Sequence, residues 1–320
     1  MTENRYTRLE RTDTIVFIVL TSFTPLTRRC LMSSVRIHCF FDDITNTASY
    51  LIADPLSKQC AIIDSVLNFD QASATTTTTL ADQLIRYIDE QQWQCLWILE
   101  THAHADHLTA APYLQKKLGG KLAIGSKITA TQAIFKTVFN FEESFALDGS
   151  QFDQLLDDGD ILSLGKLSIK VLHTPGHTPA CVTYLIEDTA FVGDTLFMPD
   201  YGTARCDFPG GDASTLYQSI QKILSLPSQT RLFTGHDYKS PNRDFYAWQS
   251  TVAEQQEQNI HIHKNVTMDE FTSFRNQRDS SLSMPKLMLP AVQINIRAGH
   301  LAAASSNGLH YLSIPINAFK

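Results

Sequence analysis

The sequence predicts an α/β fold, and three observations support this. Short apolar runs with the character of strands alternate with segments whose apolar residues recur at helical spacing. Turn-forming Gly, Pro and Asp residues separate many of these segments. Four of the apolar runs are followed at once by histidine or aspartate. Because functional side chains are often held on loops by a rigid scaffold, these four segments are predicted to meet at one site.

The expected elements fill the chain from Met32 to about residue 240. Strands are predicted at residues 35–41, 49–53, 60–64, 95–99, 121–125, 167–172, 191–193 and 232–234. Helices are predicted at residues 80–88, 110–118, 128–139 and 212–224. The threonine-rich run at 75–79 is expected to be a solvated loop.

Composition limits the class of protein. The chain has 320 residues, of which 43% are hydrophobic and 18% charged, as in a globular protein with a sizeable core. Its formal net charge of -7 argues against a nucleic-acid binder, because such proteins usually carry a basic face. The six cysteines form no C-x-x-C pair, so a disulfide framework is not expected, and a reducing, cytoplasmic location is favoured.

The N-terminal residues 1–31 are predicted to lie outside the fold. Their apolar run at 14–23 is too short to span a bilayer. Arginines precede this run, but no small-residue cleavage site follows it. Two explanations stay open: an over-long assigned start, with translation beginning at Met32, or a cleaved export signal.

A cluster of metal-ligand residues follows the strand expected at 95–99. Three histidines and an aspartate lie within six residues, namely His102, His104, Asp106 and His107. In an extended segment His102 and His104 point the same way, because side chains two residues apart share a face. Imidazole and carboxylate bind divalent first-row metals, so this cluster predicts a metal site. The alternative is a solvated polar loop that holds no metal.

Three later segments repeat the pattern of a strand followed by a ligand residue. His177 lies in a turn fixed by two prolines and a glycine, directly after the strand expected at 167–172. Asp194 and His236 follow the strands expected at 191–193 and 232–234. We therefore predict that these three residues complete the site begun by the histidine cluster.

These motifs together resemble the metallo-β-lactamase superfamily. The resemblance rests on H-A-H-A-D-H, the G-H-T turn, the G-D pair and the late G-H-D-Y segment, and covers roughly residues 35–240. It implies an αββα four-layer sandwich of two facing mixed β-sheets, with the metal site along the sheet edges. We assign residues 32–248 to this catalytic domain and residues 249–320 to a C-terminal extension that completes it. In members with two metals, the matching residues would be His102, His104 and His177 for the first, Asp106, His107 and His236 for the second, and Asp194 as the bridge.

Finer features are similar to the persulfide dioxygenases of that superfamily. Residues 202–209 resemble their G-x-R-T-D-F segment, although Cys206 stands where threonine is usual. The H-D-Y at 236–238 also resembles that family, whereas glyoxalase II enzymes usually have H-E-Y. The tail at 287–297 looks like the family's closing segment.

The persulfide dioxygenase resemblance implies one Fe(II) per chain. The matching ligands are His102, His177 and Asp194, a two-histidine, one-carboxylate set that leaves positions open. The remaining candidates, which would surround this iron or hold a second metal, are His104, Asp106, His107 and His236.

The implied reaction is the oxidation of glutathione persulfide by O2 to sulfite, with release of glutathione. Arg205 is the candidate for binding a glutathione carboxylate, and the alternative is a salt bridge with Asp207. Tyr238 either donates a hydrogen bond to glutathione or packs. Asp106 and His107, without a second metal, would orient water or a ligand.

Two other functions stay open from the sequence. A thioester hydrolase of the glyoxalase II type would use two Zn(II), or Fe and Zn, to activate water. A metal-dependent binding or sensing protein that has lost catalysis is disfavoured by the intact ligand set. No nucleic-acid or membrane partner is expected, and a homodimer is one expected assembly.

Overall fold

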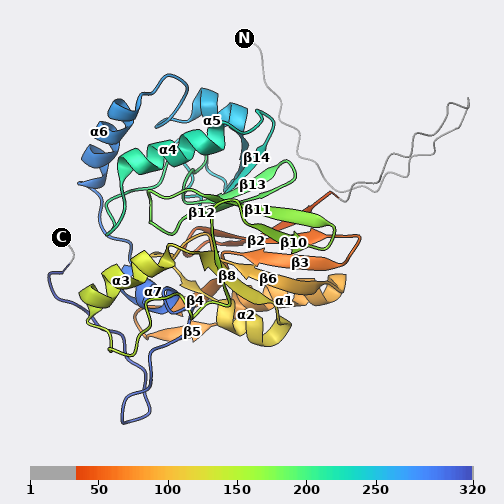
Figure 1. The fold of residues 1–320 in the computed structure, drawn as a ribbon. Coiled ribbons are helices and arrows are strands. Elements are labelled where there is room, and N and C mark those ends of the chain that lie inside the picture. Colours follow the sequence, from red (N-terminus) through yellow and green to blue (C-terminus); the bar gives the residue numbers. More distant parts are fainter. Residues whose placement is uncertain (1–33, 319–320) are drawn as a thin grey trace, which may run out of the picture. The chain divides into compact units, whose positions relative to one another are not determined.

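Two six-stranded sheets form the centre of the computed structural model, which describes residues 34–318 (Figure 1). The first sheet has the order β1-β2-β3-β6-β8-β9. Strands β1 to β3 are antiparallel, and β3, β6, β8 and β9 are parallel, so the sheet is mixed. Its strands are β1 (Arg36–Asp42), β2 (Thr47–Asp54), β3 (Gln59–Ile63), β6 (Gln94–Leu99), β8 (Lys121–Gly125) and β9 (Gln154–Leu156).

The second sheet is also mixed. Its order is β10-β11-β12-β13-β14-β15, and only the β13–β14 pair is parallel among its neighbours. Its strands are β10 (Ile161–Leu164), β11 (Leu167–His173), β12 (Val182–Ile186), β13 (Thr189–Gly193), β14 (Arg231–Thr234) and β15 (Gln249–Thr251). A small third sheet joins β5 (Thr75–Thr77), β4 (Val66–Asp70) and β7 (Leu108–Thr109).

Helices cover the outer face of each large sheet, as the two separate outer clusters of buried apolar residues show. The first sheet carries α1 (Thr79–Gln91), α2 (Ala111–Leu118), α3 (Ile128–Phe139) and α7 (Met288–Asn295). The second sheet carries α4 (Ala213–Leu224), α5 (Val252–Gln258) and α6 (Met268–Asp279). The predicted four-layer αββα sandwich is therefore confirmed. No helix of the described residues is long and apolar enough to cross a membrane.

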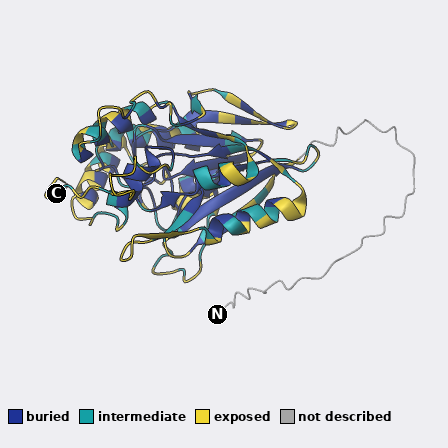
Figure 2. Ribbon diagram, turned by 90° about the horizontal axis from the view of Figure 1, so that it is seen from below, coloured by how far each residue is buried: buried dark blue, intermediate teal, exposed yellow. Residues whose placement is uncertain are grey.

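The alternation of side chains along the strands builds the layers. On β2, Tyr50 and Ile52 point into the cluster between the two sheets, whereas Leu51 and Ala53 point toward the outer helices. All eight residues of β2 are buried, which is expected for a strand covered on both faces. Figure 2 shows the sheets as mostly buried and the outer helices as partly exposed.

The structure departs from the expected elements in a few places. The threonine-rich run at 75–79 is not a loop throughout, because residues 75–77 form β5 and pair with β4. Exposed threonines suit an edge strand, since β-branched side chains favour extended backbone. The prediction for residues 1–31 lies outside the described residues. Residues 249–320 contain β15, α5, α6 and α7, and their assignment as an extension stays a prediction.

We expect the layer between the sheets to dominate stability. Phe191 is 1% exposed and its ring centroid lies 5.1 Å from that of Tyr50 and 5.2 Å from that of Phe233. The change Phe191→Ala should lower the free energy of unfolding by about 3–5 kcal/mol, because it leaves a cavity in this layer. Chemical denaturation measures the loss. The control Phe245→Ala removes a ring that is 66% exposed, and a comparable loss there would contradict the prediction.

Candidate metal centre

Four strand ends deliver the predicted ligand residues to one region. The loop at 102–107 follows β6 of the first sheet. His177 follows β11, Asp194 follows β13 and His236 follows β14, all in the second sheet. These three strands run in the same direction, because β11 and β13 are both antiparallel to β12, and β14 is parallel to β13. Their carboxyl ends therefore lie at the same edge of that sheet.

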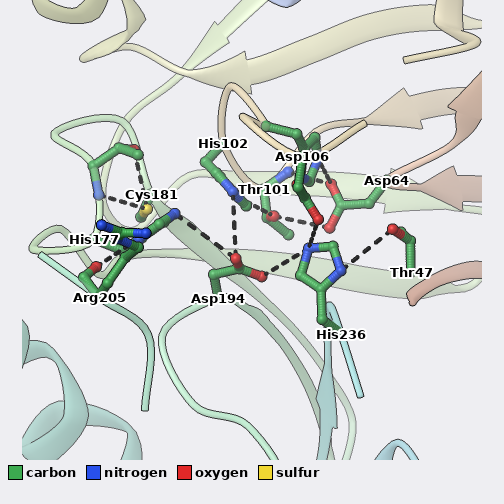
Figure 3. Close-up of polar contacts among 12 residues, drawn as sticks. Thr47, Asp64, Thr101, His102, Asp106, His177, Cys181, Asp194, Arg205 and His236 are labelled. Atoms are coloured by element: carbon green, nitrogen blue, oxygen red, sulfur yellow. Dashed lines mark hydrogen bonds and ion pairs between the residues drawn. The ribbon is translucent and has the colours of Figure 1, made fainter. Parts of the chain in front are cut away.

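Asp194 lies at the centre of the site (Figure 3). Its Oδ2 is 3.9 Å from Nε2 of His102 and 3.7 Å from Nε2 of His177. Its Oδ1 is 3.3 Å from Nε2 of His236, and that nitrogen is 3.2 Å from Oδ2 of Asp106. One carboxylate thus faces two groups of ligands with different oxygens.

The polar atoms of the site fit a bound metal better than a hydrogen-bond network. Two ligand atoms each about 2.1 Å from one ion lie roughly 3.0–3.4 Å apart, close to the separations around Asp194. Three sets of described residues have ligand atoms within 4.8 Å of one another: His102 with His177 and Asp194, His104 with Asp106, His107 and His236, and His104 with Asp64 and Glu100. Six buried atoms of these sets lack a hydrogen-bond partner, namely His102 Nε2, His104 Nδ1, Asp106 Oδ2, His107 Nε2, Asp194 Oδ1 and His236 Nε2. Leaving this many buried groups unpaired is costly unless an ion meets them.

Hydrogen bonds from the surrounding chain orient each imidazole. The backbone carbonyl of Arg205 lies 2.7 Å from Nδ1 of His177 and accepts its proton, which leaves Nε2 free. Thr101 Oγ1 lies 3.0 Å from Nδ1 of His102, and Thr47 Oγ1 lies 3.3 Å from Nδ1 of His236. In each case these hydrogen bonds use Nδ1, and Nε2 is the nitrogen that faces Asp194.

His104 is oriented the other way round by two acidic residues that the sequence analysis missed. Its Nε2 lies 3.1 Å from Oδ1 of Asp64 and 3.2 Å from Oε2 of Glu100, so its Nδ1 is the free nitrogen. Asp64 follows β3, and Glu100 directly follows β6. Both are acidic residues next to an apolar strand, the same signal that singled out Asp194.

Burial and neighbouring charges shift the pKa values of the acidic residues and histidines of the site. Burial raises the pKa of Glu100. Burial also acts to raise the pKa of Asp64, but His104 and hydrogen bonds from Thr101 outweigh it and lower the pKa. Burial lowers the pKa of His102 and of His107. These two imidazoles are therefore neutral near pH 7, which is the form that binds metal.

A cavity of about 560 Å³ opens onto Asp106, His177 and Asp194. Its walls are partly aromatic, from Phe69, Phe197, Tyr201, Phe208 and Tyr238. Its basic lining residues are Arg205, Arg275, Arg278 and Lys286. A cavity of this size fits a small organic molecule.

The two predicted substrate contacts both line this cavity. The Arg205 guanidinium binds both oxygens of Asp207 at 2.6 Å and donates to the Ser283 carbonyl at 2.7 Å. The salt bridge that the sequence left as an alternative is thus present. Tyr238 is 38% exposed, and its ring stacks on His236 with centroids 5.8 Å apart.

Comparison with known proteins identifies relatives over most of the chain. A probable metallo-hydrolase of Burkholderia pseudomallei (strain 1710b) is 55% identical over 294 residues, covering 89% of this chain and 100% of its own. Glyoxylase B2 of Dictyostelium discoideum is 48% identical over 292 residues, covering 91% and 100%. The mitochondrial persulfide dioxygenase ETHE1 of Homo sapiens is 30% identical over 268 residues, covering 83% and 89%.

A solved structure and a family profile agree with these relatives. The crystal structure of ETHE1 from Myxococcus xanthus matches with a TM-score of 0.66 and 28% identity, covering 83% of this chain and 100% of its own. The sequence profile of the Metallo-beta-lactamase superfamily matches residues 43–236, which include every candidate ligand. The chain belongs to the metallo-β-lactamase superfamily.

Proposed function

We propose that the protein is a glutathione-persulfide dioxygenase with one Fe(II) per chain. In the balanced reaction, glutathione persulfide, O2 and water give glutathione and sulfurous acid, which ionises to sulfite. The observation that carries the proposal is the compact set of His102, His177 and Asp194. Two histidines and one carboxylate are typical of non-haem Fe(II) oxygenases. The resemblance to ETHE1 proteins supports the same choice.

The chain's own contribution is to hold these groups and to position the two substrates. When bound, Fe(II) supplies the redox chemistry that side chains lack. The Arg205 carbonyl fixes the His177 ring, and His177 and Asp194 border the cavity, so the substrate sulfur has a route to the site. The aromatic walls formed by Phe197 and Phe208 exclude water from that route.

The basic residues at the cavity are the proposed contacts for the carboxylates of glutathione. The Arg205 guanidinium is already paired with the Asp207 carboxylate, so it is less available to bind a glutathione carboxylate than the sequence suggested. Arg278 and Lys286 are exposed, line the same cavity and make no ion pair with any described residue. Two free cations match the two carboxylates of glutathione. Tyr238, at the same cavity, is proposed to hydrogen-bond the substrate.

The second candidate is a dinuclear thioester hydrolase of the glyoxalase II type. The observation that favours it is the complete second set of His104, Asp106, His107 and His236, which Asp194 faces with its other oxygen. Relatives named metallo-hydrolase and glyoxylase also favour it. Zn(II), or Fe and Zn, would then occupy both sets. A cytoplasmic location and a homodimer stay predictions under either function.

Removing His177 should abolish metal retention, because the primary set has only three members. We expect His177→Ala to contain little iron by elemental analysis and to show no turnover. The matched control is His173→Ala, four residues earlier in the chain, whose ring lies 3.0 Å from the Pro179 carbonyl instead of facing the site. Near-stoichiometric iron in folded His177→Ala, or equal loss in both variants, would contradict the assignment.

The choice between one metal and two depends on His236. If His236 surrounds a single iron, His236→Ala should keep most of its iron and some persulfide-dependent O2 uptake, with a loss of about 10–100-fold in activity or affinity. The wild-type protein should consume O2 with glutathione persulfide and cleave S-lactoylglutathione poorly. An oxygen electrode and a thioester assay on one preparation measure both. Fast thioester cleavage without O2 uptake, from protein with two metals per chain, would overturn the dioxygenase proposal.

The two free cations should affect substrate binding more than the chemical step. We expect Arg278→Ala and Lys286→Ala each to raise KM for glutathione persulfide by about two- to fivefold and to leave kcat nearly unchanged, because exposed ion pairs are modest. The effect should shrink at high salt. Lys170→Ala on β11, outside the cavity, controls for the change in net charge. An equal KM effect of Lys170→Ala, or none for either cavity variant, would remove these residues from the substrate site.

A further inference from the structure

We propose that Asn295, at the end of α7, positions the metal-binding loop. The loop at 100–107 connects β6 to β7 and belongs to no strand. Asn295 is 3% exposed and donates from Nδ2 to the carbonyls of His104 and His107, both at 2.8 Å. Its Oδ1 accepts from the Thr109 amide at 2.9 Å. One side chain from far along the sequence therefore holds two points of this loop and one point of β7, the strand that follows it.

The chemistry of the amide suits this role. A primary amide has two N–H donors and one carbonyl acceptor; both donors of Asn295 are used on the loop, and its acceptor is used on Thr109 of β7. No charged side chain matches this pattern, because an aspartate lacks the donors and a lysine lacks the acceptor. The contact thus uses the full hydrogen-bonding pattern of a primary amide, which a buried charged group cannot reproduce.

Packing fixes the position of α7 beside the loop. Ala291 and Ile294 of α7 form one apolar cluster with Leu108, the first residue of β7. Gly299, just after the helix, has φ +86°, and a Cβ there would lie 2.5 Å from Pro112 Cδ. The backbone of the tail therefore approaches α2 as closely as only glycine permits. The apolar contacts before Asn295 and the close approach of Gly299 after it therefore fix the position of Asn295 beside the loop.

The loop in question carries most of the candidate ligands. His102, His104, Asp106 and His107 all lie on it, and two of the three points that Asn295 holds are the backbones of His104 and His107. A loop free to relax would spread these side chains and weaken metal binding, because ligand sets bind tightly when they are already arranged. Asn295 lies outside the 43–236 segment that matches the superfamily profile. The inference needs only that the loop binds metal, whichever reaction the site performs.

The test compares two buried amides of the same helix. Gln293 is 4% exposed, and its Nε2 donates to the carbonyls of Leu289 and Ser313 instead of to the loop. We expect Asn295→Ala to raise the dissociation constant for Co(II) about tenfold and to alter the visible absorption of bound Co(II). Gln293→Ala should change neither. Competition against a chromophoric chelator gives the constants, and thermal melting of the metal-free proteins shows whether each variant folds.

A second variant covers the case in which Asn295→Ala does not fold. Asn295→Asp keeps the side-chain volume and the acceptor for Thr109, but removes both donors, so it should also weaken Co(II) binding about tenfold. A folded variant at Asn295 with wild-type affinity and spectrum would overturn the proposal. Equal losses in the Gln293→Ala control would also overturn it, since they would indicate a general effect of α7. Because the readout is metal binding without turnover, its failure is distinct from failure of the dioxygenase proposal.

Discussion

The rest of the structure depends on the buried carboxylate of Asp194. It faces His102 and His177 with one oxygen and His236 with the other, so it joins ligands that come from both sheets. Bringing these groups together leaves nitrogens and oxygens without hydrogen-bond partners, a cost that a bound cation offsets. The strand ends of the two sheets must therefore stay in contact for the site to exist, and the apolar layer between the sheets keeps them there.

Two glycines of the motifs, Gly193 and Gly235, lie where the chain around the site is closely packed. Gly193 has φ +51°, and a Cβ on it would lie 2.5 Å from Oγ1 of Thr101, at the start of the histidine loop. A Cβ on Gly235 would lie 2.7 Å from Oδ1 of Asp194. The glycine of the G-D pair therefore leaves room for the Thr101 side chain of the first sheet, and the glycine of the late G-H pair leaves room for the Asp194 carboxylate on the neighbouring strand. Asp194 and His236 can approach each other because the residue before each of them is a glycine, which has no side chain.

The sequence predicted the fold and the ligand candidates because both are local signals. His177, Asp194 and His236 each come within a few residues of the end of an apolar strand, and strand ends of one sheet can be placed without knowing distant contacts. Several groups that orient the ligands were not predicted, because they come from far along the chain. Asp64 lies 40 residues from His104, and Asn295 lies 191 residues from it. Arg205 and Asp207 were close enough in sequence to be weighed as a pair, yet only the structure shows that both oxygens are used.

The ligand set alone fits one ion or two, so the choice of reaction depends on what surrounds it. Nε2 of His236 lies 3.2 Å from Asp106 and 3.3 Å from Asp194, a separation that either a shared proton or a metal ion can bridge. The unpaired buried atoms divide unevenly between the two sets. Four of the six belong to His104, Asp106, His107 and His236 of the second set, and two belong to His102 and Asp194 of the first. The second set therefore gains at least as much from a bound cation as the first, and filling it would turn a redox site into a site that can activate water for hydrolysis.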